Sequence, residues 1–258
     1  MRWPFARGKR EPEPFPDEWR AVIARNVSHW RLLEGEERLR LEDLTWSLID
    51  DKRWEAARGF ELTDEIKVTI GAQATLLTLG FGDDAYFLYD DVTTIIVHPS
   101  TMNFEHERVG PARGTRTREQ LPLLGEAIYR GPVIIAWDAA LEGARHPERG
   151  HNVVYHEFAH RLDMLDGTVN GTPPLATAGQ IADWVTVCTA EFEAVRDGTS
   201  GELLDAYAGT NPAEFFAVVT EVFFDQPLEL EAHKPALYRV LKEFYRQDTA
   251  VRARRDRP

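Results

Sequence analysis

Residues 156 to 160 read His-Glu-Phe-Ala-His, and this pentapeptide constrains the chain more than any other segment does. A helix turns by about 100° per residue, so His156 and His160 project from one face and can bind one metal ion. Glu157 would lie beside that ion, where its carboxylate can take a proton from a water molecule. The pattern therefore predicts a helix that presents a catalytic metal site.

The residues around the pentapeptide have helical periodicity. One face carries an apolar stripe formed by Val154, Phe158, Leu162 and Leu165. Asn152 is a suitable N-cap, and Asp166-Gly167 is a turn sequence that ends the helix. The two histidines and Asp163 fall on a different face, where Asp163 could either orient a ligand imidazole or be an exposed carboxylate. The alternative interpretation is a pair of hydrogen-bonded core histidines.

A catalytic zinc ion usually has three protein ligands, so a third ligand must come from elsewhere in the chain. Asp166 stands where the extended motif HExxHxxGxxH has its last histidine. That motif requires glycine at position 163, where this chain has Asp163, and a later methionine turn. No methionine follows Met164. Asp166 is therefore the weaker candidate.

Glu214 is the stronger candidate for the third ligand. Asn211-Pro212 predicts the start of a helix that is apolar on nearly every side, and such a helix is buried. A buried carboxylate needs a strong partner, which a metal ion supplies. Glu221 lies on the same face, seven residues later. It is predicted to accept a hydrogen bond from a ligand histidine, through the ring nitrogen that does not bind the metal. A capping role near the helix start is the alternative for Glu214.

The distribution of predicted elements indicates an α+β fold with a small central sheet. Helices are expected from 17 through about 33, 36 to about 55, 63 to about 80, 152–165, about 179–196, 212–225 and 229–247. Strands are expected at 93–97, 132–137 and around 127–130, with an exposed loop at 107–119. Residues 1–16 are predicted to be a flexible tail, 17–248 a single domain with a helical part at 17–62, and 249–258 a basic tail.

Composition narrows the functional class. The 258 residues are 43% hydrophobic and include seven tryptophans, which is enough for a sizeable core. The formal net charge of −13 argues against binding nucleic acid or an anionic membrane surface. No apolar run has the length of a signal peptide core or a membrane span. Cys188 is the only cysteine, which suits a reducing compartment, so a cytoplasmic location is expected.

Two segments together resemble the Mlc titration factor A family of bacterial zinc peptidases. One is the run from His156 to Gly167, and the other is Tyr207 followed seven residues later by Glu214 in Asn-Pro-Ala-Glu-Phe-Phe-Ala. The Tyr-to-Glu spacing is also similar to that of the catalytic domain of anthrax lethal factor. The resemblance extends from about Phe15 to Tyr245 and is looser outside the two motifs.

The resemblance implies a zincin-like metallopeptidase core and a role for each site residue. His156, His160 and Glu214 would bind Zn²⁺, Glu157 would be the general base, and Tyr207 would stabilise the transition state. It also implies an aminopeptidase-like activity on a peptide or protein substrate, with a transcriptional repressor as a further partner. The alternative function is a regulatory protein that sequesters a repressor of sugar-uptake genes and has little peptidase activity.

Overall fold

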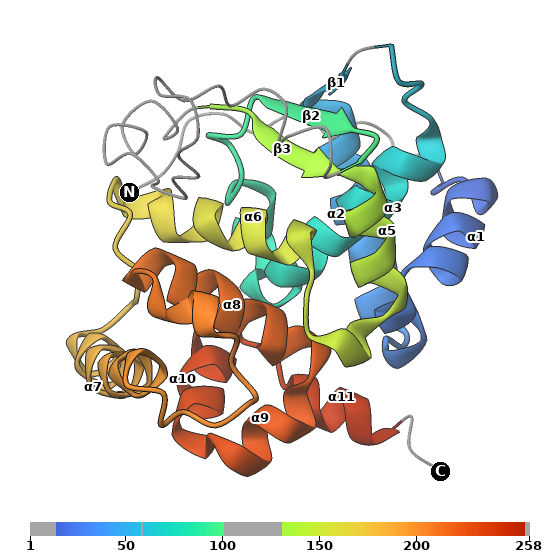
Figure 1. Ribbon diagram of the computed structural model, residues 1–258. Coiled ribbons are helices and arrows are strands. Elements are labelled where there is room, and N and C mark those ends of the chain that lie inside the picture. The colour runs from blue at the N-terminus through green and yellow to red at the C-terminus, as the bar shows by residue number, and fades with distance from the viewer. Residues whose placement is uncertain (1–13, 58, 101–130, 256–258) are drawn as a thin grey trace, which may run out of the picture.

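The computed structural model describes residues 14–57, 59–100 and 131–255, and Figure 1 shows their arrangement. The strands are β1 (Arg53–Ala56), β2 (Thr94–His98) and β3 (Val133–Ala136). The helices before the histidine motif are α1 (Asp17–Asn26), α2 (Glu36–Asp51), α3 (Asp64–Thr78) and α5 (Trp137–Arg145). The later helices are α6 (Val153–Asp163), α7 (Ala178–Arg196), α8 (Pro212–Asp225), α9 (Pro227–His233), α10 (Pro235–Tyr245) and α11 (Thr249–Arg255). Helices thus dominate, with a small sheet, which is consistent with the expected α+β class.

The three strands form a parallel sheet in the order β1-β2-β3. Trp54 is in register with Ile95, and Ile95 with Val133. In the central strand, Ile95 and Val97 are fully buried. A parallel pair needs a long crossover, which α3 supplies between β1 and β2. Within the described residues β3 pairs with β2 alone, so it lies at an edge.

Helix α6, which carries the histidine motif, passes through the middle of the molecule (Figure 1). The sheet and α3 lie on one side of it and α8 lies on the other. Its apolar stripe is buried, with Val154, Phe158 and Leu162 fully inaccessible. Packing on both sides therefore fixes the rotation of α6 about its axis and the direction of its histidine face.

The observed helix α2 is shorter than the helix predicted from 36 to about 55. It ends at Asp51, and residues 53–56 form β1 instead. Lys52 is buried with extended backbone, and its Nζ donates to the carbonyl of Tyr89 at 2.6 Å. The backbone N–H of Arg53 donates to the carbonyl of Thr93 at 3.0 Å. Pairing with a distant strand thus overrides the helical pattern around Trp54.

The C-terminal region differs from the sequence prediction in two ways. The expected helix over 229–247 is two helices, because Pro235 has no N–H to continue α9. The expected basic tail after residue 248 forms α11 up to Arg255. Ala250 is fully buried there, and Arg252 forms an ion pair with Glu37 of α2 at 2.6 Å.

Other differences concern the start of the chain and α5. The first helix ends at Asn26 and is followed by a 3₁₀ turn, and α5 begins at Trp137, where the strand was expected to end. The expected strand at 127–130, the loop at 107–119 and most of the 1–16 tail lie outside the described residues. Among the described helices, none combines the length and the apolar character that crossing a bilayer requires.

Candidate metal centre

The start of α6 is held by its predicted N-cap. The side-chain oxygen of Asn152 accepts hydrogen bonds from the backbone N–H groups of Val154 and Tyr155, each at 3.1 Å. Asn152 itself is fully buried. The cap therefore fixes the first turn of the helix, four residues before the first histidine.

Helix α8 begins as predicted and positions Glu214. The side-chain oxygen of Asn211 accepts the N–H of Glu214 at 3.0 Å, and Pro212 occupies the first turn. Every residue from 213 to 224 is buried. Glu214 and Glu221 are each only 5% exposed, so both carboxylates need polar partners inside the protein.

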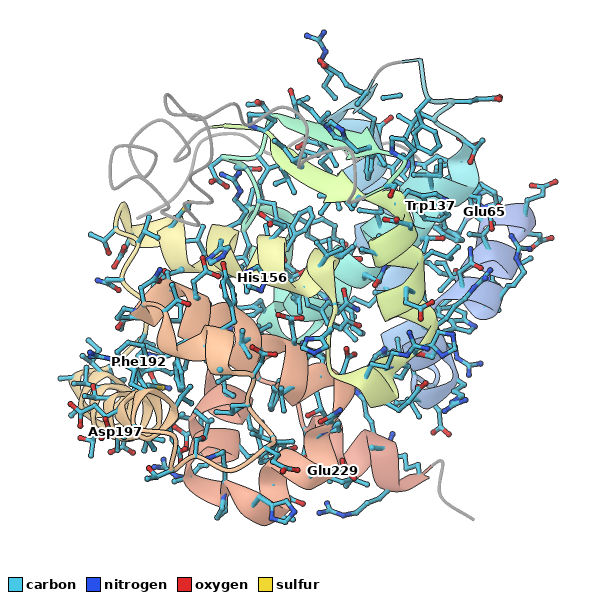
Figure 2. The ribbon with its side chains drawn as sticks, in the orientation of Figure 1. Glu65, Trp137, His156, Phe192, Asp197 and Glu229 are labelled. Carbon is cyan, nitrogen blue, oxygen red and sulfur yellow. The ribbon has the colours of Figure 1, made fainter. Side chains whose placement is uncertain are left out.

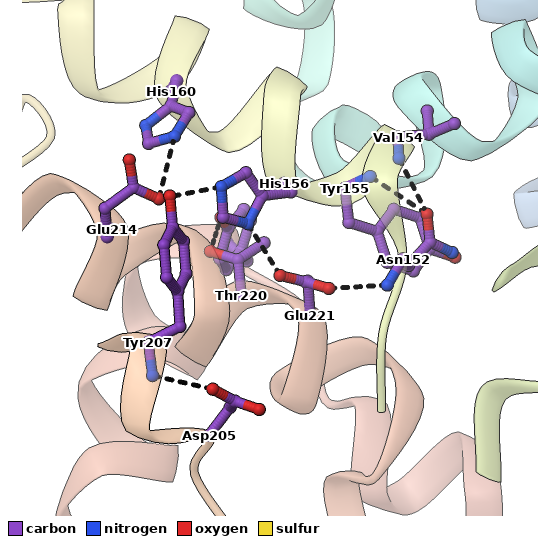
Figure 3. Close-up of polar contacts among 11 residues, drawn as sticks. Asn152, Val154, Tyr155, His156, His160, Asp205, Tyr207, Glu214, Thr220 and Glu221 are labelled. Carbon is purple, nitrogen blue, oxygen red and sulfur yellow. Dashed lines mark hydrogen bonds and ion pairs between the residues drawn. The ribbon is translucent and has the colours of Figure 1, made fainter. Parts of the chain in front are cut away.

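Those partners are the histidines of α6 (Figure 3). Figure 2 shows His156 on α6 in the middle of the molecule. Nε2 of His156 lies 3.0 Å from Oε2 of Glu214, and Nε2 of His160 lies 3.7 Å from the same oxygen. The three potential ligand atoms all lie within 4.8 Å of one another. Ligand atoms around a tetrahedral ion with bonds of about 2.0–2.1 Å stand about 3.3 Å apart. The spacing and the donor set therefore fit a divalent metal.

Electrostatics links the histidines and the carboxylates. Burial disfavours the charged form of His156, but hydrogen bonds to Glu214 and Glu221 outweigh it and raise the pKa of His156 to about 10. Burial of Glu214 acts to raise its pKa, while the hydrogen bonds from His156 and His160 hold that pKa well below its usual range. The Glu214 carboxylate is thus paired with positive charge on the histidine side, the charge that a bound metal cation would supply in place of the imidazole protons.

Glu157 and Tyr207 lie close to the cluster. Glu157 is half-buried and follows His156 directly in α6. Tyr207 lies in a 3₁₀ turn over Ala206–Gly209, is 40% exposed, and has its ring centroid 6.1 Å from that of His156. Its hydroxyl end is directed toward Glu214 (Figure 3). Asp205 caps the turn by accepting the N–H of Tyr207 at 2.7 Å.

The weaker candidate for the third ligand is not part of the cluster. Asp166 is exposed, and its carboxylate accepts from the N–H of Thr168 at 2.9 Å. Asp163 is fully buried, where its Oδ2 accepts the N–H of Gly171 at 2.9 Å. Burial raises the pKa of Asp163 to about 6. In the described part of the chain, the metal-ligand grouping therefore consists of two histidines and Glu214.

The family model for glucose-regulated metallo-peptidase M90 matches residues 2–246. The chain belongs to this metallo-peptidase family. Membership implies a divalent metal, and the cluster of two histidines and Glu214 could hold one.

Individual relatives agree with the family assignment. Uncharacterized protein slr2042 of Synechocystis is 34% identical over 237 residues, which cover 90% of this chain and 84% of the relative. Mlc titration factor A of Yersinia pestis and of Yersinia pseudotuberculosis are each 29% identical over 261 residues, covering 99% of this chain and 93% of theirs. The resemblance to the Mlc titration factor A family that the two motifs indicate is thus confirmed.

Proposed function

We propose that this protein is a zinc-dependent peptidase with a zincin-like core, in which His156, His160 and Glu214 bind the metal. The convergence of their three ligand atoms from α6 and α8 carries this proposal. Membership in a metallo-peptidase family supports it. When bound, zinc would act as a Lewis acid that polarises a peptide carbonyl and acidifies water.

The protein's own residues would move the protons. Glu157 would take a proton from the attacking water as general base and pass it to the leaving amine. The Tyr207 hydroxyl would donate a hydrogen bond to the oxyanion that develops on the carbonyl oxygen. The half-buried position of Glu157 and the direction of Tyr207 toward the cluster support these roles.

We further propose an aminopeptidase-like activity on extended peptides. The backbone of such a substrate could pair with β3, which lies at the edge of the described sheet. The name of the Yersinia relatives, Mlc titration factor A, favours a second candidate function, the binding of a transcriptional repressor. Both functions are compatible with one protein.

The test compares wild type, Glu157→Gln and Glu193→Gln on chromogenic aminoacyl and short peptide substrates, with zinc content measured in each. Glu193 is an exposed residue of α7 and serves as the control. We expect Glu157→Gln to keep its zinc and to lose about 10²–10⁴-fold in kcat, and Glu193→Gln to resemble wild type.

Full activity of Glu157→Gln would contradict the assignment of the general base. If all three proteins hold zinc and none cleaves any substrate, the repressor-binding candidate becomes the better explanation. A binding measurement with purified Mlc, the protein in the name of the Yersinia relatives, would then test the repressor-binding function.

A further inference from the structure

We propose that Glu221 is a positioning residue for His156, at the centre of a buried hydrogen-bonded chain that continues through Asn152 to Gln73. The chain connects α8, the start of α6 and α3, which are far apart in sequence. The inference rests on the proposed function in one respect only, the assignment of His156 as a metal ligand.

Both carboxylate oxygens of Glu221 are used (Figure 3). Oε1 lies 2.8 Å from Nδ1 of His156, and Oε2 accepts the backbone N–H of Asn152 at 2.6 Å. Because a carboxylate only accepts, Nδ1 of His156 must be the donor. Nε2 faces the Glu214 carboxylate at 3.0 Å and is the nitrogen that would bind the metal on losing its proton.

Asn152 connects this contact to the rest of the protein. Its side-chain oxygen caps α6, and its Nδ2 donates to Oε1 of Gln73 at 2.9 Å. Gln73 is fully buried, and its Nε2 donates to the carbonyl of Ala140 at 3.3 Å. A Cβ added to Gly143 would lie 3.0 Å from the Cα of Asn152, so α5 also packs closely against the cap.

These hydrogen bonds set the orientation of the His156 ring in the metal-free protein. A shift of Asn152 would break its hydrogen bonds to α3 and α6. The hydrogen bond from its backbone N–H therefore holds Oε2 of Glu221 in place. The other oxygen then fixes the direction of the Nδ1–H bond and hence the plane of the ring. Partners of this kind, behind a ligand histidine, typically contribute about 10–100-fold in metal affinity.

Replacement of Glu221 by glutamine tests the chain with little change in shape. A carboxamide has one acceptor oxygen, whereas two donors, Nδ1–H of His156 and N–H of Asn152, must be satisfied. The matched control is Glu42→Gln. Glu42 is also 5% exposed and also accepts with both oxygens, from Arg20 at 2.6 and 2.9 Å, but it lies in α2.

Zn²⁺ affinity would be measured by competition with a chromogenic chelator, and thermal unfolding would be followed for the metal-free proteins. We expect Glu221→Gln to remain folded and to raise the Kd for Zn²⁺ about 10–100-fold, while Glu42→Gln leaves that Kd unchanged. A ¹H–¹⁵N spectrum of zinc-loaded wild type should show a protected Nδ1–H signal from His156. This signal should be lost or shifted in Glu221→Gln only.

Wild-type Zn²⁺ affinity in Glu221→Gln would overturn the proposal. Equal weakening in Glu221→Gln and Glu42→Gln would also overturn it, because a general loss of stability would then explain the effect. None of these three measurements uses peptide cleavage, so a failure of the peptidase proposal would be seen separately, in the Glu157→Gln comparison.

Discussion

The imidazole of His29 is 7% exposed and uses both ring nitrogens inside the protein. Nε2 lies 3.0 Å from the carbonyl of Phe224, and Nδ1 lies 3.3 Å from the Tyr155 hydroxyl. A neutral ring fits this pair, with Nε2–H donating to the carbonyl and Nδ1 accepting from the hydroxyl. Burial, which disfavours the charged ring, lowers the pKa of His29 to about 4 from an ordinary 6.5.

This lowered pKa predicts a pH dependence of stability at a single residue. Between pH 6.5 and 4 the unfolded chain binds a proton at His29 that the folded protein does not, so stability falls as the pH falls. We expect the free energy of unfolding of wild type to exceed that of His29→Gln at pH 7.5. The difference should shrink by about 1.4 kcal/mol at pH 5.5.

Urea denaturation of both proteins at the two pH values measures this difference. Comparing wild type with the variant removes the contribution of groups whose pKa is the same in both proteins. Asp225, whose pKa burial raises, has its Oδ1 3.4 Å from Nε2 of His29, so Asp225→Asn in both backgrounds is the control. A difference that is constant or grows toward pH 5.5 would show that His29 is charged in the folded protein.

At the scale of single elements, the helix starts determine where the site residues stand. Asn211 caps α8 through the N–H of Glu214, which is itself a candidate metal ligand. Thr177 caps α7 in the same way through the N–H of Gln180, at 3.2 Å, but α7 carries no site residue. Comparing substitutions at the two caps therefore distinguishes an effect on helix stability from an effect on the geometry of the site.

Replacing each cap by alanine should lower the free energy of unfolding by about 1 kcal/mol. We expect Asn211→Ala also to weaken Zn²⁺ binding several-fold, because the turn that carries Glu214 loses its anchor, and Thr177→Ala to bind Zn²⁺ as wild type does. Chemical denaturation and chelator competition provide the two measurements. Equal Zn²⁺ affinity in the two variants would indicate that packing of α8 alone positions Glu214.

Across the whole molecule, the C-terminal helices pack against the segment that follows α3. The C-terminal end of α10 lies against Gly80, and a Cβ added there would be 2.3 Å from the carbonyl oxygen of Tyr245. Nearby, the side chain of Gln247 donates to the carbonyls of Leu76 and Leu77 at 3.0 and 3.1 Å. Gly80 is thus required by close approach of two distant backbones.

Gly80→Ala should therefore destabilise the protein by about 2–4 kcal/mol, since backbone atoms cannot move aside as side chains can. The control is Gly179→Ala in the first turn of α7, where the nearest neighbour of the new Cβ is Thr177 Oγ1 at 3.9 Å. Alanine should stabilise that position by up to about 1 kcal/mol. Urea denaturation measures both changes, and comparable stability of the two variants would contradict this account.

Much of the candidate metal centre could be predicted from the sequence, because helix caps and apolar stripes depend on neighbouring residues. The caps Asn152 and Asn211, and the apolar stripe of α6, depend on contacts within a few residues, and the structure confirms each of them. The start and end of α8 agree with the prediction for the same reason. Tyr207 is different, because a tyrosine in a short turn has no local signal, and only the family resemblance indicated it.

Local sequence was sufficient to predict the helix that presents His156 and His160 and the burial of the helix that carries Glu214, because periodicity and capping are properties of neighbouring residues. Three features could not be predicted: β1 replaces the end of a predicted helix, Arg252 of α11 pairs with Glu37 of α2, and Asn152 connects Glu221 to Gln73. Each of these depends on partners that are far apart in the chain. Such contacts form only when the whole fold brings the partners together, so no short segment of sequence encodes them.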